Sequence, residues 1–472
     1  MSLTLGLVVV LLGPAFSSRD AVGPDGPASP AIARLAGDKA LKDLDLGASV
    51  RCTVDDAVWG AHRGAVPMSP ASGAKLLTTA AALAVLGPDF TTATRIHARV
   101  DGGVGKDVAL VAGADPSLTL DDLDRLAQAV KAAGVTRIEG GVAFDLGVFA
   151  GSPTPPAFDT KNTDAGYRPE VPSFAVVSGT FSATVTAGKA VGAPVRVTTS
   201  LLAPSILLEN NATTAAGKAI DKLVIEARAG KDGATRLIVS GSLGKEAPPQ
   251  GVKKRLADPA RTAAELFVAA LRRAGVDVDG GVRFAAMTDG VAEIARLTSD
   301  PLAADVRETN TTSNNFMAET IFKHLGRARP DAGATWEQAA ERVAAALSEL
   351  GLAKDRFTIV NGSGLYFGTK VAADAMTELL TVESHPSAAA DAFRASLAVA
   401  GKTGTLKGRL KKLAGKVSGK TGTLDNALSL SGYVPAKGCL LAFSVMVNGD
   451  IGDRAGAVNR RIDAFVLELA GL

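Results

Sequence analysis

The chain has 472 residues, of which 47% are hydrophobic and 21% are charged, and its formal net charge is +3. This balance is typical of a globular protein with two or three domains and a large core. A net charge so close to zero gives no reason to expect nucleic acid as a partner.

Residues 3–12 form an apolar run that small residues follow. The run is too short to span a bilayer and resembles a secretory signal, although no Lys or Arg precedes it. We expect a signal peptide over residues 1–17, a flexible leader over 18–30, and export. The alternative is a disordered cytosolic tail.

The chain has two cysteines, one expected within a strand (Cys52) and one at the start of another (Cys439). They could form a disulfide in an oxidising compartment, but two cysteines make a weak pattern. We therefore expect two buried thiols.

A short loop at residues 68–73 leads into an Ala/Leu-rich helix that ends at Gly87, about four turns later. Ser72 lies in its first turn and Lys75 three positions on, so the two side chains share one face. A serine hydroxyl becomes a nucleophile when a nearby base takes its proton, and a buried lysine can be that base. Alone, the pair is also compatible with an ordinary core helix.

The middle of the chain contains an internal repeat. Two helix patterns, 121–133 and 262–273, each end in a glycine and lead into a strand with a Gly-Gly pair. Residues 193–208 and 222–243 are β-rich, the latter a hairpin turning at Gly230-Lys231-Asp232-Gly233. This region indicates an insertion that shapes a substrate groove.

Towards the end of the chain, Thr335 caps a helix that runs to Leu350. Three short strands follow after residue 420. Together with a strand near residue 50, they predict an α/β (α+β) sandwich: an antiparallel sheet packed with helices and closed by both ends of the chain.

Two further motifs support the Ser72 and Lys75 pairing. Ser313-Asn314-Asn315 stands at the start of a helix pattern, and Lys420-Thr421-Gly422-Thr423 precedes the strand pattern 427–434. The order Ser-x-x-Lys, Ser-x-Asn, Lys-Thr-Gly is that of serine β-lactamases and penicillin-binding proteins.

The resemblance extends to residues 113–119, Asp145 with Phe149, residues 361–365 and residues 429–433. From about residue 35 to 470 the chain resembles the D-alanyl-D-alanine carboxypeptidase/endopeptidase family, the class C low-molecular-mass penicillin-binding proteins. The resemblance implies a transpeptidase-like catalytic domain over residues 31–94 and 292–472, with an inserted region of one or two small domains over 95–291.

The resemblance also implies roles for the motif residues. Ser72 would attack the carbonyl between two D-alanines, with Lys75 as base; Ser313 would relay a proton and Asn315 would bind the substrate amide. Lys420 would keep the site electropositive and, with Thr421 and Thr423 flanking Gly422, hold the terminal carboxylate. The N–H groups of Ser72 and Thr423 would form the oxyanion hole. Asp145 is a candidate contact for the peptide stem, or else a structural Asp in a turn.

The implied partners are peptidoglycan stem peptides and, as covalent inhibitors, β-lactams, in the periplasm or a cell-wall compartment. No metal or cofactor is expected, and the histidines His62, His97, His324 and His385 lack metal-ligand spacing. The alternatives are a β-lactamase and a non-catalytic peptidoglycan-binding or assembly protein of the same fold.

Two positions depart from the family pattern: Asn314 stands where Asp is frequent, and Thr311 where Lys is frequent. These changes put turnover and substrate preference in question more than the fold.

A second Lys402-Thr-Gly-Thr405 also occurs, but a polar basic segment follows it, so we assign catalysis to the copy at Lys420. Residues 414–421 fit a relaxed phosphate-loop pattern. A basic linker precedes it and a strand follows, which argues against nucleotide binding. We expect the basic run 407–420 to be a solvated loop, with attraction to anionic wall polymer as the alternative.

Overall fold

The computed structural model describes residues 26–158, 163–220, 222–327 and 333–472. The expected signal peptide over 1–17 lies outside these residues, as does most of the expected leader. The end of that leader, at 29–30, is not irregular but opens helix α1 (Ser29–Ala36), in which Ala31, Ile32 and Leu35 are buried.

The sheet of the catalytic domain has six strands in the order β18-β19-β20-β21-β1-β2. All its neighbouring pairs are antiparallel. Its strands are β1 (Asp45–Cys52), β2 (Val58–His62), β18 (Ala398–Val399), β19 (Ser418–Leu424), β20 (Ala427–Ala436) and β21 (Cys439–Asn448). Because β1 pairs with β21, the two ends of the chain form one sheet, as the sequence predicted.

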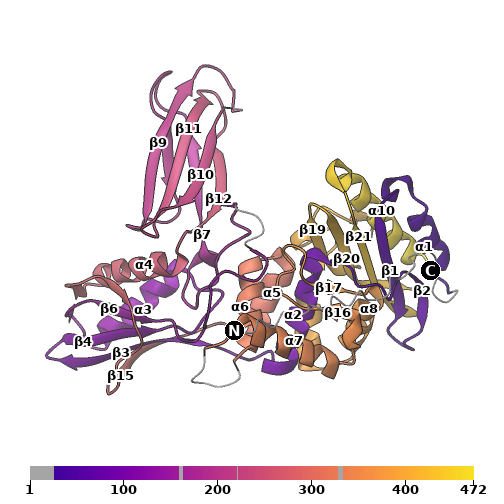
Figure 1. Ribbon diagram of the computed structural model, residues 1–472, viewed down its shortest axis with the longest axis horizontal. Helices are drawn as coiled ribbons and strands as arrows, with labels where there is room; N and C mark the ends of the chain where they lie inside the picture. The colour runs from indigo at the N-terminus through magenta and orange to yellow at the C-terminus, as the bar shows by residue number, and fades with distance from the viewer. Residues whose placement is uncertain (1–25, 159–162, 221, 328–332) are drawn as a thin grey trace, which may run out of the picture.

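Helices cover both faces of this sheet (Figure 1). On one face lie α1 and α10 (Ala455–Leu469), and on the other α8 (Ala373–Val382), which contacts β1 and β21. Behind α8 stands a group of helices around α2, whose residues from Ala74 to Leu83 are all buried. The group comprises α2 (Ala74–Leu86), α5 (Leu302–Thr312), α6 (Asn315–Leu325), α7 (Trp336–Glu349) and α9 (Ala388–Ala395).

The inserted region holds a seven-stranded sheet on which helices α3 (Leu120–Ala132) and α4 (Pro259–Arg273) pack. Its strands are β3 (Ala93–Asp101), β4 (Val104–Val111), β5 (Arg137–Ile138), β6 (Val142–Asp145), β13 (Asp277–Val278), β14 (Val282–Phe284) and β15 (Ala292–Thr298). The predicted repeat is confirmed as a structural pair: β13 runs parallel to β5, and β14 parallel to β6.

A β-rich lobe stands away from this sheet (Figure 1). It consists of two three-stranded sheets, β10-β11-β9 and β12-β7-β8. Its strands are β7 (Thr180–Thr186), β8 (Arg196–Thr199), β9 (Ile206–Ala215), β10 (Val224–Ala229), β11 (Thr235–Gly244) and β12 (Gln250–Arg255). The antiparallel pair β10 and β11 confirms the predicted hairpin.

The sheet of the inserted region extends past residue 292, where we expected the catalytic domain to resume. Residue 292 is the first of β15, which pairs with β3 in that sheet. Two short strands, β16 (Phe357–Thr358) and β17 (Lys370–Val371), lie in the returning part of the chain. We propose that the catalytic domain resumes after Thr298, where the chain leaves β15 for α5.

The cap predicted at Thr335 is confirmed, and a second helix begins in the same way. Thr119 forms a capping box with Asp122 at the start of α3, and Thr335 forms one with Gln338 at the start of α7. In both, the hydroxyl accepts from an N–H of the first turn, which has no partner within the helix.

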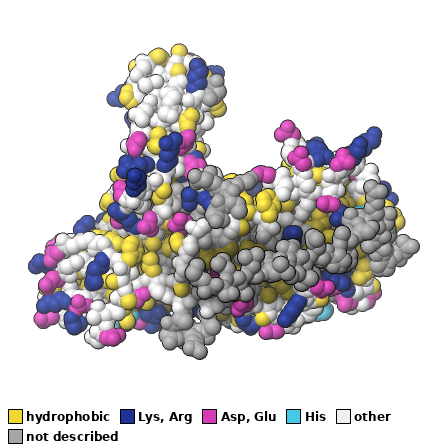
Figure 2. Space-filling model, in the orientation of Figure 1, with side chains coloured by type: hydrophobic (Ala, Val, Ile, Leu, Met, Phe, Trp, Pro, Cys, Tyr) yellow, Lys and Arg dark blue, Asp and Glu magenta, His cyan; other side chains and the backbone are white. Residues whose placement is uncertain are grey.

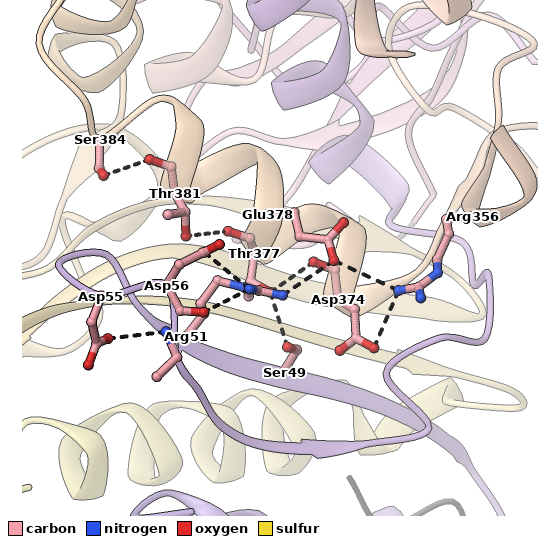
Figure 3. A network of polar contacts seen from close by, with 11 residues as sticks. Ser49, Arg51, Asp55, Asp56, Arg356, Asp374, Thr377, Glu378, Thr381 and Ser384 are labelled. Atoms are coloured by element: carbon pink, nitrogen blue, oxygen red, sulfur yellow. Dashed lines mark hydrogen bonds and ion pairs between the residues drawn. The ribbon is translucent and has the colours of Figure 1, made fainter. Parts of the chain in front are cut away.

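A polar network joins β1 to α8 outside the active-site cavity (Figure 3). Arg51 donates to the Asp56 carbonyl at 2.9 Å and to Glu378 at 3.3 Å. Arg356 lies 3.6 Å from Asp374 and 3.9 Å from the same Glu378. Pairs of this partly exposed kind each contribute about 0–1 kcal/mol, so we expect them to fix the position of α8 more than to stabilise the fold.

Basic and acidic side chains are interspersed over the face of the molecule seen in Figure 2. This agrees with the small net charge of +3. No helix in the described part of the chain is both long and apolar enough to cross a membrane.

The expectation of two buried thiols is wrong, because Cys52 and Cys439 form a disulfide with their Cα atoms 5.9 Å apart. The bridge joins the end of β1 to the start of β21, 387 positions later. The pairing of β1 with β21, which brings the two cysteines together, is a tertiary property that two isolated cysteines do not reveal.

We expect replacement of both cysteines by alanine to lower the free energy of unfolding by about 2–5 kcal/mol, because the crosslink restrains a very long loop of the unfolded chain. Urea unfolding of the wild type and the double variant measures the difference. Reductant should lower the stability of the wild type only. Equal stability of the two proteins without reductant would contradict the prediction.

Candidate active site

Ser72 lies in a single 3-10 turn, Ala71–Gly73, that leads directly into α2. It is half-buried, whereas its neighbours Ala71 and Gly73 are buried. The helix ends at Gly87, whose φ of 80° favours glycine, as the sequence predicted. Ser72 is therefore partly accessible to solvent at the N-terminal end of a largely buried helix, where developing negative charge is favoured.

Lys75 is completely buried and donates three hydrogen bonds. Its Nζ lies 3.0 Å from Ser72 Oγ, 2.7 Å from Asn315 Oδ1 and 2.9 Å from the Ser363 carbonyl. Burial lowers the pKa of Lys75 to about 7, although the negative charge of Glu319 opposes the shift. An amine with this pKa is unprotonated in a large fraction of molecules at neutral pH and can accept the hydroxyl proton of Ser72.

The second motif lies at the junction of two helices. Helix α5 ends at Thr312, Ser313 adopts a left-handed conformation with φ of 64°, and α6 begins at Asn315. This bend directs Ser313 towards Lys420, whose Nζ donates to Ser313 Oγ at 2.8 Å and to the Thr421 carbonyl at 2.7 Å. Burial lowers the pKa of Lys420 well below its ordinary value, and the positive charge of Lys75 lowers it further.

The two departures from the family pattern both have structural partners. Asn314 is the N-cap of α6: its Oδ1 accepts from Met317 N–H at 3.2 Å, and its Nδ2 donates to Ser178 Oγ at 3.0 Å. Asn and Asp cap helices equally well, so the change is compatible with this backbone. Thr311 donates to the Ser396 carbonyl at 2.9 Å.

The third motif lies in β19, as predicted. Its neighbour β18 pairs with β19 only at Ser418 and Gly419, which leaves the motif at the sheet edge. The second Lys-Thr-Gly-Thr copy is not in a strand, since it ends in the 3-10 turn Gly404–Leu406. Its Thr405 hydroxyl nevertheless accepts from Thr421 Oγ1 at 2.8 Å. Thr405 of the earlier copy therefore helps to fix the position of Thr421 in the later copy.

The motif residues surround a cavity of about 480 Å³. It is lined by Ser72, Tyr167, Ser313, Asn315, Leu365, Tyr366, Phe367, Thr423, Leu424, Asp425, Gly452 and Ala455. The three motifs are far apart in sequence, yet the Ser72 hydroxyl, the Asn315 amide and the edge of β19 all line the same cavity. The inserted region contributes Tyr167, whose carbonyl accepts from Asn315 Nδ2 at 2.7 Å.

Asp145 is not among the residues that line this cavity. It ends β6, where Oδ1 accepts from Gly147 N–H at 2.9 Å and Oδ2 from Met287 N–H at 2.8 Å. Phe149 packs against the ring of buried His324, and the Lys323 ammonium lies over the ring of Phe149. These contacts are those of a structural Asp in a turn, the alternative that the sequence left open.

Sequence reasoning missed Glu319, Ser363 and Tyr167. Glu319 follows Asn315 by four positions and therefore lies on the same helix face, a signal that could have been used. Ser363 belongs to a segment noted only for its resemblance, and it acts through its backbone carbonyl. No pattern in the sequence singles out Tyr167.

No histidine is among the described residues that line the cavity with Ser72. Buried His324 bonds through Nε2 to the Ala114 carbonyl at 2.8 Å, and burial lowers its pKa to about 4. Within the described ranges, no group of three or more His, Cys, Asp or Glu side chains could hold a metal ion.

Comparison with solved structures defines the class of this fold. Penicillin binding protein 4 (dacB) from Haemophilus influenzae superposes with a TM-score of 0.81 and 21% identity, covering 93% of this chain and 99% of that one. The fold is therefore the transpeptidase-like fold of a penicillin-binding protein. The D-Ala-D-Ala carboxypeptidase 3 (S13) family matches residues 28–469, and the chain belongs to that family.

Relatives agree with this assignment. A D-alanyl-D-alanine carboxypeptidase of Actinomadura sp. is 33% identical over 478 residues, covering 94% of this chain and 88% of the relative. Carboxypeptidase DacB of Mycolicibacterium smegmatis is 26% identical, covering 91% and 82%. The chain is a serine-type D-Ala-D-Ala carboxypeptidase, a hydrolase, as the motifs predicted.

Proposed function

We propose that the protein cleaves the D-Ala-D-Ala ends of peptidoglycan stem peptides, or their D-Ala–diamino-acid crosslinks, through an acyl-enzyme on Ser72. The observation that carries the proposal is the buried Lys75 amine, 3.0 Å from the Ser72 hydroxyl and 2.7 Å from Asn315. A base at hydrogen-bond distance from the nucleophile, oriented by a third group, is the arrangement that activates a serine.

In the acylation step, Ser72 Oγ attacks the carbonyl carbon of the penultimate D-alanine while Lys75 accepts the hydroxyl proton. The carbonyl oxygen becomes negative, and the N–H groups of Ser72 and Thr423 are its proposed donors. Each such donor is typically worth about 3–4 kcal/mol of barrier. Asn315 orients Lys75 through its oxygen, and it lines the cavity where the substrate amide lies.

Departure of the leaving amine requires a proton on its nitrogen. Ser313 is placed to relay it, because its hydroxyl accepts from Lys420 Nζ at 2.8 Å and lines the cavity. Lys420, with the hydroxyls of Thr421 and Thr423, provides the positive and polar environment for a terminal carboxylate. The proton that reaches the amine is the one that Lys75 took from Ser72, so Lys75 is again unprotonated. Water then attacks the acyl-enzyme while Lys75 accepts its proton, and Lys75 returns that proton to Ser72 Oγ as the ester bond breaks and the acid product leaves.

Two kinds of relatives bear on the substrate. The curated relatives are named as carboxypeptidases, which supports release of terminal D-alanine. A predatory peptidoglycan endopeptidase from Bdellovibrio bacteriovorus has a TM-score of 0.55 at 15% identity, so it shares the fold. Cleavage of crosslinks is therefore part of the proposal. A wall substrate requires export, which the apolar run at residues 3–12 supports.

β-Lactams are the proposed covalent inhibitors. They resemble the D-Ala-D-Ala amide, and the Haemophilus influenzae protein has been solved in complex with a β-lactam. When Ser72 opens a β-lactam ring, an acyl group stays on the enzyme. Acylation by a β-lactam therefore requires the same hydroxyl and the same base as acylation by the peptide.

Incubation with penicillin followed by intact-mass measurement tests the proposal. We expect one covalent adduct on the wild type and none on Ser72→Ala. Ser69→Ala is a matched control, since Ser69 lies in the same loop but does not line the cavity. An adduct that survives Ser72→Ala would refute the proposed nucleophile. Rapid hydrolysis of the drug without D-alanine release from a pentapeptide would indicate a β-lactamase instead.

A further inference from the structure

Glu319 is a carboxylate with no exposure to solvent that lies one helical turn beyond Asn315 in α6. Its two oxygens accept from Gly362 N–H at 2.9 Å and from Ser363 N–H at 2.8 Å. An ionised carboxylate is an acceptor only, and here both oxygens meet donors. These bonds favour the charged form, and they oppose burial, which raises the pKa of Glu319.

The segment that Glu319 holds is the one that contacts the base. Ser363 donates its N–H to Glu319 and offers its carbonyl to Lys75 Nζ at 2.9 Å. The neighbouring Gly362 carbonyl accepts from Thr78 Oγ1 of α2 at 2.7 Å. The loop is thus fixed between α6 and α2, and its position determines where the third acceptor of Lys75 lies.

The charges in this interior are few. Lys75 and Lys420 are the buried amines of the three motifs, and Glu319 is the carboxylate that interacts with Lys75. Acidic groups of neighbouring helices act elsewhere: Glu337 of α7 on Lys323, and Asp305 of α5 near Asp115. Since an unpaired buried charge is costly, the Glu319 carboxylate stabilises the ammonium form of Lys75.

We propose that Glu319 is a positioning residue for the reaction at Ser72: it fixes the Ser363 carbonyl against Lys75, and its charge stabilises the ammonium form of Lys75. The inference rests on the proposed function, because it concerns the base of that reaction. Glu319 touches no substrate, since it does not line the cavity.

The charge of Glu319 has a measurable consequence. It raises the pKa of Lys75, against the larger lowering by burial. If the charge is removed, the ammonium form of Lys75 becomes less favourable and its pKa falls. Activity that requires the unprotonated amine then appears at lower pH, while loss of one N–H bond to the loop lowers the maximum rate.

The experiment measures kcat/KM for D-alanine release, and the rate of acylation by penicillin, as functions of pH for wild type and Glu319→Gln. For Glu319→Gln we expect the acid limb, which is the rise of kcat/KM on the acidic side of the pH profile, to move to lower pH by about one unit or more. The maximum value of kcat/KM should fall about tenfold to a hundredfold. Glu383→Gln is the matched control, because it removes another buried carboxyl at the C-terminal end of α8. Its acid limb should stay at the wild-type pH.

An unmoved acid limb in Glu319→Gln would overturn the proposal and leave Glu319 a structural role only. Should Glu319→Gln fail to fold, Glu319→Asp decides, because it keeps the charge but is too short to hold both N–H groups. It should retain the wild-type limb with a reduced maximum, and full activity would contradict the positioning role. The penicillin adduct on wild-type Ser72 is a separate result, so failure of the proposed function and failure of this inference are distinguishable.

Discussion

Replacing Lys75 by methionine should lower kcat/KM for D-alanine release by about 10²–10⁴-fold, the usual worth of a positioned general base. The side chain keeps its length and apolar stem but loses the amine that lies 3.0 Å from Ser72 Oγ. In the wild type, kcat/KM should rise with pH through about 7, because only the unprotonated amine accepts a proton and burial lowers the pKa of Lys75 to about 7. The variant should lose this rise. Rates of D-alanine release measured from pH 5 to 9 test both expectations.

Lys323→Met is the matched control for this experiment. Lys323 is also a buried lysine of the catalytic domain, but its Nζ lies over the rings of Phe149 and Trp336, 5.0 and 4.5 Å from their centres. Its replacement should affect stability more than the rate. Wild-type activity in Lys75→Met, or an equal loss in both variants, would contradict the assignment of Lys75 as the base.

Replacing Gly422 by alanine should lower the acylation rate by about 10²-fold, because displacement of a reacting group by about 1 Å has an effect of this size. A Cβ at this position would lie 2.3 Å from the Pro70 carbonyl and 2.3 Å from Ser429 Oγ. Those two groups are themselves hydrogen-bonded at 2.6 Å, so neither can move alone. The 3-10 turn that carries Ser72 must therefore move away from β19. Stopped-flow acylation with a chromogenic β-lactam measures the loss.

Gly251→Ala provides the comparison, since Gly251 also lies in a strand (β12) and no atom lies within 4 Å of its would-be Cβ. It should acylate at the wild-type rate. If Gly422→Ala does the same, the close approach of β19 to the Ser72 turn is not required for catalysis.

Most of the local structure could be predicted from the sequence. Capping residues such as Thr119 and Thr335 and the stop at Gly87 depend on contacts within one turn, so the sequence predicts them directly. The order of the three motifs indicated which serine and lysines would meet. Their geometry was not predicted, because Ser72, Ser313 and Lys420 come together only when β19 packs against the start of α2.

The expectation about the cysteines failed, and the role of Thr405 was missed, because both depend on contacts between separate elements. Cys52 and Cys439 are bridged because β1 pairs with β21. Thr405 supports Thr421 because a loop turns back on the strand edge. In each case the partner lies far away in sequence, where no local periodicity records it.

By itself, the sequence predicted a transpeptidase-like fold whose sheet is formed by both ends of the chain, and it singled out Ser72, Lys75, Ser313, Asn315 and Lys420 as the candidate site. The tertiary structure alone decided how this site is charged. Whether a lysine is protonated at neutral pH or can act as a base depends on how far burial removes its hydration and on whether a carboxylate lies nearby. For Lys75 both are set by burial beneath α6 and by Glu319, 244 positions further along the chain.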